Sequence, residues 1–406
     1  MPLSKITAAS ISDNSVTTAK VADDAITGAK IENNPTIAGN LTVSGSFAPS
    51  KNTSNKNMLI NGGMRISQRN GTSAVTVSAA AGVYTLDRWQ LYTNSGNYSV
   101  QQITDTTLPS GFLNAAKITV SSVGNTSGSG NAVHFEQKIE GNNISHLNWG
   151  GGNAGTARTC TLSFFVKSSV TGTYSVHLGN DNDRFYIATY TIDSANTWEK
   201  KSITLAGPSD GTWNTGTGRG LEIVWVLLQG SGGTTSSLNQ WISTSQTFAS
   251  TSTTQWGTNA GATFYLTGCQ FEISSVATPF EHESYTNDLA KCQRYFVMDK
   301  AGTAYKRYLQ GVCTTATWTE CLYYYPVTMR AQPSLGSSGT NGHYLIEVNS
   351  GASASPSEAP SRSSHSDTTN CIVNLRVSGS TLTTGANCQI TSYNTTSGYL
   401  SYDAEL

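Results

Sequence analysis

LEIVWVLLQ, residues 221–229, is apolar on both of the faces that a β-strand presents. Side chains in a strand point alternately to opposite sides of the sheet, so a run of this kind is buried on both sides. The run therefore predicts a central strand that is covered on both faces, with Trp225 in the core. Long loops rich in Gly, Ser and Thr flank it at 207–220 and 230–237.

The segments around this run resemble further strands. In TCTLSFFVKS (159–168), Leu162, Phe164 and Val166 share one face, and AVHFEQKI (132–139) shows the same alternation. Many short strands with long loops at their ends are typical of a β-sandwich. We therefore predict an all-β chain whose main unit is a jelly-roll-like β-sandwich.

The composition agrees with this fold class. Only 12% of the 406 residues are charged, which is about half the usual share of a soluble domain. The chain nevertheless has 18 Tyr, 11 Phe and 8 Trp, and this aromatic content argues against extensive disorder. Because 406 residues exceed one ordinary core, two folded units are expected besides an N-terminal repeat.

Changes of pattern divide the chain into five segments. Near residue 286 the spacing becomes helical, with Thr286 or Asn287 as the expected cap. Strand-like alternation returns afterwards, interrupted by a Ser/Pro/Ala-rich stretch at 350–368 that we expect to be a mobile surface loop. The predicted order is a repeat and shaft segment at 1–50, a linker at 51–56, the jelly-roll sandwich at 57–285, a connecting helix at 286–299 and a smaller C-terminal β-sandwich at 300–406.

The N-terminal repeat is a ten-residue unit that occurs three times in residues 6–35, with a branched aliphatic at every fifth position. A period of five fits neither a helix nor a free strand. One such side chain in five cannot offset an ordering entropy of roughly 1–2 kcal/mol per residue in a lone chain. The segment is therefore expected to dock on another protein or to wind around copies of itself, through Ile6, Ile11, Val16, Val21, Ile26 and Ile31.

Charge and cysteine usage exclude several classes. The net charge is −1 and no run of Lys or Arg occurs, so nucleic acid is not an expected partner. The absence of a run of 18 apolar residues argues against membrane insertion, and the sequence MPLSKITAAS does not resemble a secretory signal. The seven scattered cysteines are expected to be buried thiols, with a Cys313–Cys321 pair across a hairpin left open.

Catalytic and metal-binding patterns are missing from the sequence. No HxH, HExxH, GxSxG or P-loop spacing occurs, and we expect neither an enzyme nor a cofactor. Carboxylate pairs such as Glu136/Glu140 or Asp181/Asp183 can be chosen in any β-protein. The turn GNDND at 179–183 offers oxygen ligands for calcium but lacks the further acidic residue of an EF loop, so a tight hairpin turn is the preferred interpretation.

Carbohydrate contact fits the composition better, because sugars bind to aromatic faces surrounded by neutral hydrogen-bonding groups. Four tryptophans lie in polar loops, where packing at the ends of the sandwich is the alternative interpretation. The cluster at 323–325 must place at least one tyrosine ring outward if it forms a strand. The candidate receptor contacts are Trp149, Trp213, Trp241, Trp256, Tyr323 and Tyr325.

Several motifs in a consistent order resemble a sandwich domain of bacteriophage tail fibres and related virion appendages. They begin with NMLINGGMRISQR (57–69) and YTLDRW (84–89). The likeness continues through LSFFVKSSVTGTY, TYTIDSANTWEKKSITLAG, TFYLTGCQFEISSVATPFE and LAKCQRYF, which ends at residue 296. The stretch YYPVTMRAQPSL resembles the start of the tip domain that often follows such a sandwich.

The resemblance implies a virion adhesin. Such a protein is a homotrimer that joins other tail or capsid proteins through its N-terminal segment, points its distal end at the cell surface, and is assembled in the host cytoplasm. The resemblance carries no catalytic residues to this chain. The matching residues Arg69, Asp87, Arg88 and Trp89 are interpreted as structural, with Arg69 and Asp87 as a candidate ion pair.

Three hypotheses for function follow. The leading one is a non-enzymatic phage tail fibre protein that binds a host surface receptor, either a glycan or a protein. The alternative is a structural virion component, such as a capsid fibre or a tail adaptor, that binds other virion proteins. A polysaccharide depolymerase is third, because residues 57–406 lack the recurring short strands of a β-helix.

Overall fold

The computed structural model describes residues 55–78, 81–105, 107–153, 155–180, 183–243, 247–349, 351 and 353–406. Two predictions therefore fall outside the described residues, namely the fibrous N-terminal segment and half of the 181/183 carboxylate pair. The residues concerned are Ile6, Ile11, Val16, Val21, Ile26, Ile31 and Asp181.

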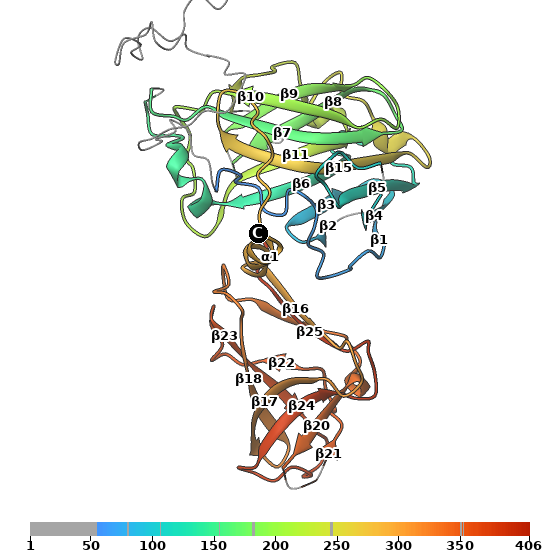
Figure 1. Cartoon of the computed structure of the whole chain (residues 1–406), viewed down its shortest axis with the longest axis vertical. Helices are drawn as coiled ribbons and strands as arrows, with labels where there is room; N and C mark the ends of the chain where they lie inside the picture. The colour runs from blue at the N-terminus through green and yellow to red at the C-terminus, as the bar shows by residue number, and fades with distance from the viewer. Residues whose placement is uncertain are drawn as a thin grey trace, which may run out of the picture. The chain divides into compact units, whose positions relative to one another are not determined.

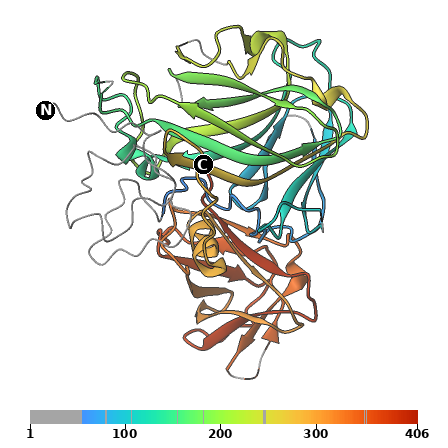
Figure 2. The same ribbon diagram turned by 45° about the horizontal axis from the view of Figure 1, so that its top comes forward.

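The larger β-sandwich consists of two mainly antiparallel sheets (Figure 1, Figure 2). One has six strands in the order β1 (Val75–Ser78), β4 (Asn97–Ile103), β5 (Ala115–Ser122), β15 (Thr263–Ile273), β7 (Cys160–Ser168) and β10 (Glu199–Leu205). The other has seven strands in the order β13 (Trp241–Ile242), β9 (Phe185–Ile192), β8 (Gly172–Gly179), β11 (Arg219–Gln229), β6 (Ala132–Glu140), β3 (Trp89–Thr93) and β2 (Ala81–Leu86).

Short elements complete the loops of this sandwich. Strands β12 (Thr234–Thr235) and β14 (Ala249–Ser250) form a separate parallel pair. Single 3-10 turns occur at Gly141–Asn143, Ser145–Leu147, Ser231–Gly233 and Trp256–Thr258. The architecture confirms the predicted all-β, jelly-roll-like fold.

The centre of the seven-stranded sheet is β11, as its sequence predicts. It pairs with β6 on one side and with β8 on the other. Its inward face contributes Trp225, which lies 5.5 Å from the Trp89 ring and 5.4 Å from the Phe164 ring. Its outward face carries Val224 and Val226, which pack in a second small cluster with residues 248–249. Both faces of β11 are therefore covered.

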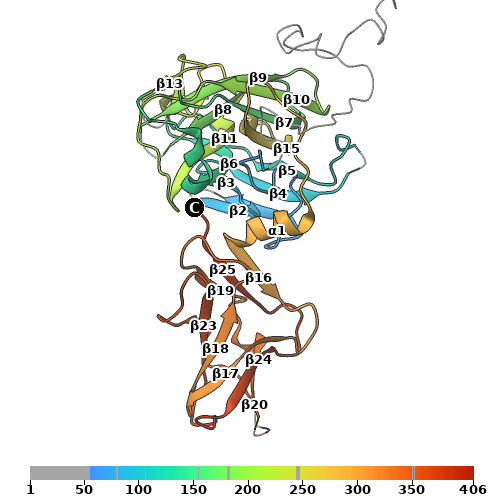
Figure 3. The ribbon, with the colours of Figure 1, turned by 60° about the vertical axis from the view of Figure 1, so that its left-hand side comes forward.

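A single α-helix, α1 (Tyr285–Gln293), follows the sandwich in the described part of the chain, and it is shorter than the predicted segment 286–299 (Figure 3). The Ser284 side chain caps it by accepting a hydrogen bond from the backbone amide of Asn287, so neither predicted cap residue is used. Phe296 already belongs to a strand, which ends the helical spacing. No helix in the described ranges is long and apolar enough to cross a membrane.

The C-terminal strands form two sheets around a second hydrophobic core. The smaller sheet has the order β16 (Phe296–Lys300), β25 (Tyr399–Asp403) and β19 (Ser334–Ser337). The larger has the order β21 (Ser353–Ala354), β20 (Tyr344–Val348), β24 (Asn387–Ser392), β17 (Arg307–Thr315), β18 (Trp318–Tyr324), β23 (Asn370–Arg376) and β22 (Ser361–Arg362). A 3-10 turn at Asn341–His343 precedes β20.

Part of the predicted mobile loop at 350–368 belongs to this larger sheet instead. Strands β21 and β22 pair with β20 and β23, respectively. Between and beyond them, the backbone amides of Ser357 and Ser363 donate to the carbonyls of Arg376 and Ile372, at 2.8 and 2.9 Å. Backbone pairing, which a Ser/Pro-rich sequence does not reveal, is what holds this segment.

All seven cysteines are buried and free, as predicted. The pairing left open does not form, because Cys313 faces Thr319 and Cys321 faces Gly311 in the β17–β18 hairpin. The Sγ atom of Cys321 instead lies 3.8 Å from that of Cys388 on β24.

Buried ion pairs join residues 403–406 to the larger sandwich. The Arg88 side chain, which is 1% exposed, pairs with Glu405. Arg69 reaches both Asp403, at 3.0 Å, and Glu405, at 3.4 Å. The Tyr84 hydroxyl donates to the backbone oxygen of Leu406 at 2.7 Å. The charged residues of the YTLDRW motif are thus structural, as their interpretation required.

Asp87 completes this buried set of charges. Its Oδ1 lies 3.9 Å from Nη1 of Arg69, which confirms the predicted ion pair. The Gln68 backbone amide donates to the same oxygen at 2.9 Å. Burial nevertheless raises the pKa of Asp87 from 3.8 to about 6, against the opposing effect of Arg69.

Replacing Glu405 with Ala is expected to lower the free energy of unfolding by about 3–5 kcal/mol, because Arg88 is then left as an uncompensated buried charge. Urea unfolding followed by circular dichroism measures this loss. The control is Glu358→Ala, which removes an exposed pair with Arg376 and should cost about 0–1 kcal/mol. Equal losses in both variants would contradict the prediction.

The raised pKa of Asp87 makes stability depend on pH. The folded state binds this proton more tightly than the unfolded chain, so the stability that it contributes is present at low pH and is lost as pH rises from about 4 to 6. Relative to Asp87→Asn, the wild-type chain should lose about 2–3 kcal/mol of stability between pH 4 and pH 7. Denaturant titrations of both proteins at the two pH values provide the test, and parallel profiles would refute it.

Candidate functional site

The outer face of the seven-stranded sheet carries polar residues next to Val224 and Val226 on its central strands. One row follows the pairing of Gln90 with Glu136, of Glu136 with Val224, and of Val224 with His177. The next row begins with Tyr92 opposite His134. These residues alternate with core residues on the same strands, so the local β-period alone places them on the face away from the sandwich core.

A segment at residues 247–249 covers part of this face and leaves a cavity of about 570 Å³ beside it. The Phe248 ring lies 4.6 Å from that of His134 and 4.7 Å from that of His177. The Phe248 amide donates to the carbonyl of Gly233 at 2.9 Å, and His177 Nδ1 donates to that of Thr247 at 2.9 Å. The lining residues are Tyr92, Ser129, Gly130, Ala132, His134, Glu136, Glu222, Gln229, Gly232, Gly233 and Phe248.

The imidazole of His134 is neutral at physiological pH. Burial lowers its pKa from 6.5 to about 4. Its Nε2 donates to Oε1 of Gln229 at 2.9 Å, and the Gln229 amide in turn donates to the Gly230 carbonyl. This pair gives the cavity an uncharged polar wall.

The pKa values of the two carboxyl groups in the cavity are shifted in opposite directions. Burial, followed by the charge of Glu222, raises the pKa of Glu136 from 4.5 to about 7. The pKa of Glu222 is lowered in spite of burial, because His177 and Arg219 stabilise its ionised form. His177 Nε2 lies 3.5 Å from Oε1 of Glu222.

Gly179 on β8 makes the contact between His177 and Glu222 possible. It lies directly opposite Glu222 in the register. A Cβ atom at this position would come within 2.5 Å of His177 Nε2. Any other residue would push the imidazole away from the carboxylate.

Aromatic faces and buried acceptors in one cavity suit a polyhydroxylated ligand. Tyr92 and Phe248 supply partly exposed rings, and Glu136, Glu222 and Gln229 supply oxygen acceptors. Within the described ranges, no group of three or more His, Cys, Asp or Glu side chains is arranged to hold a metal ion.

Three of the predicted tryptophans form a cluster elsewhere in the sandwich. The Trp149 ring lies 5.0 Å from that of Trp213 and 5.3 Å from that of Trp241. Each indole N–H donates to a backbone carbonyl, of Arg158, Asp210 and Ala206 respectively. Trp149 is buried, whereas the other two are half-buried. The cluster joins two loops to strand β13, which agrees with the packing alternative.

The other predicted aromatic contacts are largely enclosed. Trp256 is fully buried against Tyr98 and Phe264, so it cannot touch a receptor. Tyr325 is 7% exposed and Tyr323 is half-buried, stacked 4.5 Å from Tyr402. The ring that points outward is that of Tyr324, which is 71% exposed. Tyr324 therefore points outward, whereas the predicted contacts Tyr323 and Tyr325 point toward the core.

The carboxylates that the sequence suggested as pairs bind other groups in the structure. Glu140 binds Arg294 and the Tyr295 hydroxyl, at 2.6 and 2.7 Å, and does not line the cavity with Glu136. Asp183 accepts hydrogen bonds from the Asn180 side chain and, at 3.1 Å, from the Thr212 amide. The described half of the possible calcium turn is thus engaged in turn hydrogen bonds.

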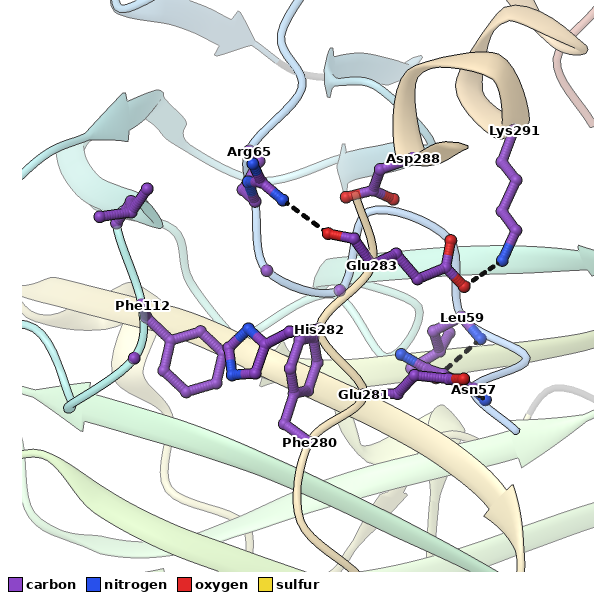
Figure 4. A pocket seen from close by; sticks show the side chains of 14 residues that line it. Asn57, Leu59, Arg65, Phe112, Phe280, Glu281, His282, Glu283, Asp288 and Lys291 are labelled. Atoms are coloured by element: carbon purple, nitrogen blue, oxygen red, sulfur yellow. Dashed lines mark hydrogen bonds and ion pairs between the residues drawn. The ribbon is translucent and has the colours of Figure 1, made fainter. Parts of the chain in front are cut away.

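A second hollow, of about 210 Å³, lies beside the start of α1 (Figure 4). Phe112, Phe280 and His282 form its aromatic wall. On its charged side, Glu283 pairs with Lys291, and the Glu283 carbonyl accepts from Arg65 at 3.0 Å. Oε2 of Glu283 has no hydrogen-bond partner in the described residues, but the hollow has less than half the volume of the cavity on the seven-stranded sheet, so it is the weaker candidate for a ligand site.

Comparison with known proteins finds no matching family model and no matching curated protein. Among solved structures, the enzymatically active domain of tailspike protein 4 from bacteriophage CBA120 matches with 15% identity and a TM-score of 0.30. The match covers 54% of this chain and 21% of the tailspike chain.

Carbohydrate-binding domains match at a similar level. The family 11 module from Clostridium thermocellum, solved with a mixed-linked tetrasaccharide, has 12% identity and a TM-score of 0.26 over 52% of this chain and 100% of its own. The cellulose-binding domain of a Cellulomonas fimi glucanase has 12% identity and a TM-score of 0.24 over 50% and 100%. At such TM-scores these likenesses carry no argument about function.

The burial of Trp256 predicts a structural role for it. Replacing it with Ala should lower the free energy of unfolding by about 3–5 kcal/mol through lost contacts and a residual cavity. Tyr324→Ala, at an exposed ring, should stay within about 0.5 kcal/mol of the wild type. Guanidinium unfolding of both variants measures the difference, and a fully stable Trp256→Ala protein would show the assignment to be wrong.

Proposed function

We propose that this protein is a non-enzymatic attachment protein of a bacteriophage particle that binds a cell-surface glycan with its jelly-roll sandwich. The cavity on the outer face of the seven-stranded sheet is the observation that carries the proposal. It combines the Tyr92 and Phe248 rings with buried oxygen acceptors, which is the combination that sugar rings and hydroxyl groups require.

The sequence supports the placement on a virion. The motifs at 57–69 and 84–89 resemble tail fibre sandwiches, and the five-residue period of residues 6–35 suits a segment that needs other chains in order to fold. We infer that residues 1–50 attach the protein to tail or capsid proteins and gather it into a homotrimer. Three weak sites would then act together, with a gain in avidity of roughly 10²–10⁴.

A structural virion component remains the second candidate. The observation that favours it is the dense pairing of the C-terminal segment with the sandwich through Arg88 and Glu405, because a spacer benefits from such rigidity. A protein of this kind would bind other virion proteins and would leave host cells unaffected.

The full-length chain should bind glycans through the cavity. On a glycan array, Tyr92→Ala and Phe248→Ala should each weaken binding at least tenfold, because they remove the aromatic walls. Tyr305→Ala, at an exposed ring of the C-terminal unit, is the matched control and should bind as the wild type does. Circular dichroism confirms that each variant is folded.

Two outcomes would count against the proposal. If the cavity variants bind glycans as strongly as the wild type, the site lies elsewhere. If the wild-type chain neither binds glycans nor blocks adsorption of the particle to its host, while light scattering still reports an oligomer, the structural component becomes the better assignment.

A further inference from the structure

The cavity wall has an uneven charge pattern. Its charged lining residues in the described structure are two carboxyl side chains, Glu136 and Glu222. Their counter-ions, Lys138 and Arg219, pair with them but do not line the cavity. His134 is neutral there. A ligand inside the cavity therefore meets hydrogen-bond acceptors and no cationic side chain.

Glu136 also has an unused oxygen. Its side chain is 9% exposed, and the one described residue that pairs with its carboxyl is Lys138, whose Nζ lies 3.6 Å from Oε1. The remaining oxygen, Oε2, has no partner in the described structure and belongs to a residue that lines the cavity. This oxygen is accessible from the cavity, so it can accept a hydrogen bond from a ligand in place of water.

We propose, on the basis of the glycan-binding function above, that the cavity binds an uncharged sugar unit whose hydroxyl groups donate to Glu136 and that it rejects acidic sugars. Hydroxyl donors satisfy Oε2, and the rings of Tyr92 and Phe248 accept the apolar face of the sugar. A sugar carboxylate would face Glu136 and Glu222 in a partly desolvated space without a cation to pair with.

The same geometry makes binding depend on pH. The charged and titratable groups around Glu136 are Lys138 and His134 on its own strand, Glu222 and Arg219 on β11 and Tyr84 on β2, with His177 beyond Glu222. With a pKa of about 7, Glu136 is mostly protonated at pH 6 and mostly ionised at pH 8. An ionised carboxylate accepts the stronger, charge-assisted hydrogen bonds. Binding therefore releases a proton, and affinity rises with pH by about tenfold over this interval.

The test compares neutral oligosaccharides with matched uronic-acid oligosaccharides on one array and in calorimetry, at pH 6 and pH 8, with the full chain. The wild type should bind its neutral ligand at least tenfold more tightly than the matched acid, and about tenfold more tightly at pH 8 than at pH 6. The isosteric Glu136→Gln variant should lose at least tenfold in affinity at pH 8 and should lose the rise with pH. Glu358→Gln, at an exposed carboxylate outside the cavity, should behave as the wild type.

The outcomes separate this inference from the function on which it rests. Preference for the acidic partner, or a neutral-sugar affinity that is flat with pH in the wild type, overturns the inference while leaving glycan binding intact. The wild-type pH profile gives this answer even if Glu136→Gln does not fold. Absence of binding to every neutral and acidic glycan overturns the proposed function and this inference together.

Discussion

The burial of β11 on both faces is the constraint on which the rest of the structure depends. Its inner face is covered by the six-stranded sheet, through contacts such as that between Trp225 and Phe164. Its outer face cannot stay exposed either, because Val224 and Val226 are as apolar as the inner residues. The segment around Phe248 therefore folds over the sheet. Because this segment covers only part of the outer face, a cavity remains beside it. The candidate site therefore results from the burial of β11.

The polar residues beneath the Phe248 segment form hydrogen bonds and ion pairs that offset the cost of their burial. His134 is held by Gln229, and His177 by the Thr247 carbonyl. Glu222 is stabilised by His177 and Arg219, whereas Glu136 pairs with Lys138 at 3.6 Å. His177 Nε2 is buried without a hydrogen-bond partner, whereas the Glu136 carboxyl group lines the cavity and is therefore the group that a ligand can reach.

Much of the fold could be predicted from the sequence, because period-two alternation and double-sided apolar runs report directly on the geometry of a strand. The central place of 221–229 and the core role of Trp225 follow from this alone. The site could not be found in the same way. Tryptophans in polar loops suggested exposure, yet Trp149 and Trp256 are buried because their rings pack into the main core of the sandwich.

The sequence pattern that could have indicated the site is the presence of ionisable residues in buried strands. His134, Glu136 and Glu222 are ionisable residues within strands that the apolar pattern marks as buried, and such residues are seldom buried without a function or a partner. The sequence does not predict that the segment around Phe248 covers this face of the sheet. Contact between residue 248 and residues 134 and 177 depends on register and on the path of a loop, neither of which has a local pattern.

The Arg88–Glu405 pair also bears on the synthesis of the protein. The two residues are 317 positions apart in the chain, so Arg88 leaves the ribosome long before its partner exists. At about 5–20 residues per second, the delay is on the order of 15–60 s. Even after Ile273 has completed the last strand of the larger sandwich, Arg88 still lacks the carboxylate that neutralises it in the folded protein. The Arg88–Glu405 pair therefore forms only after the C-terminal segment has been synthesised.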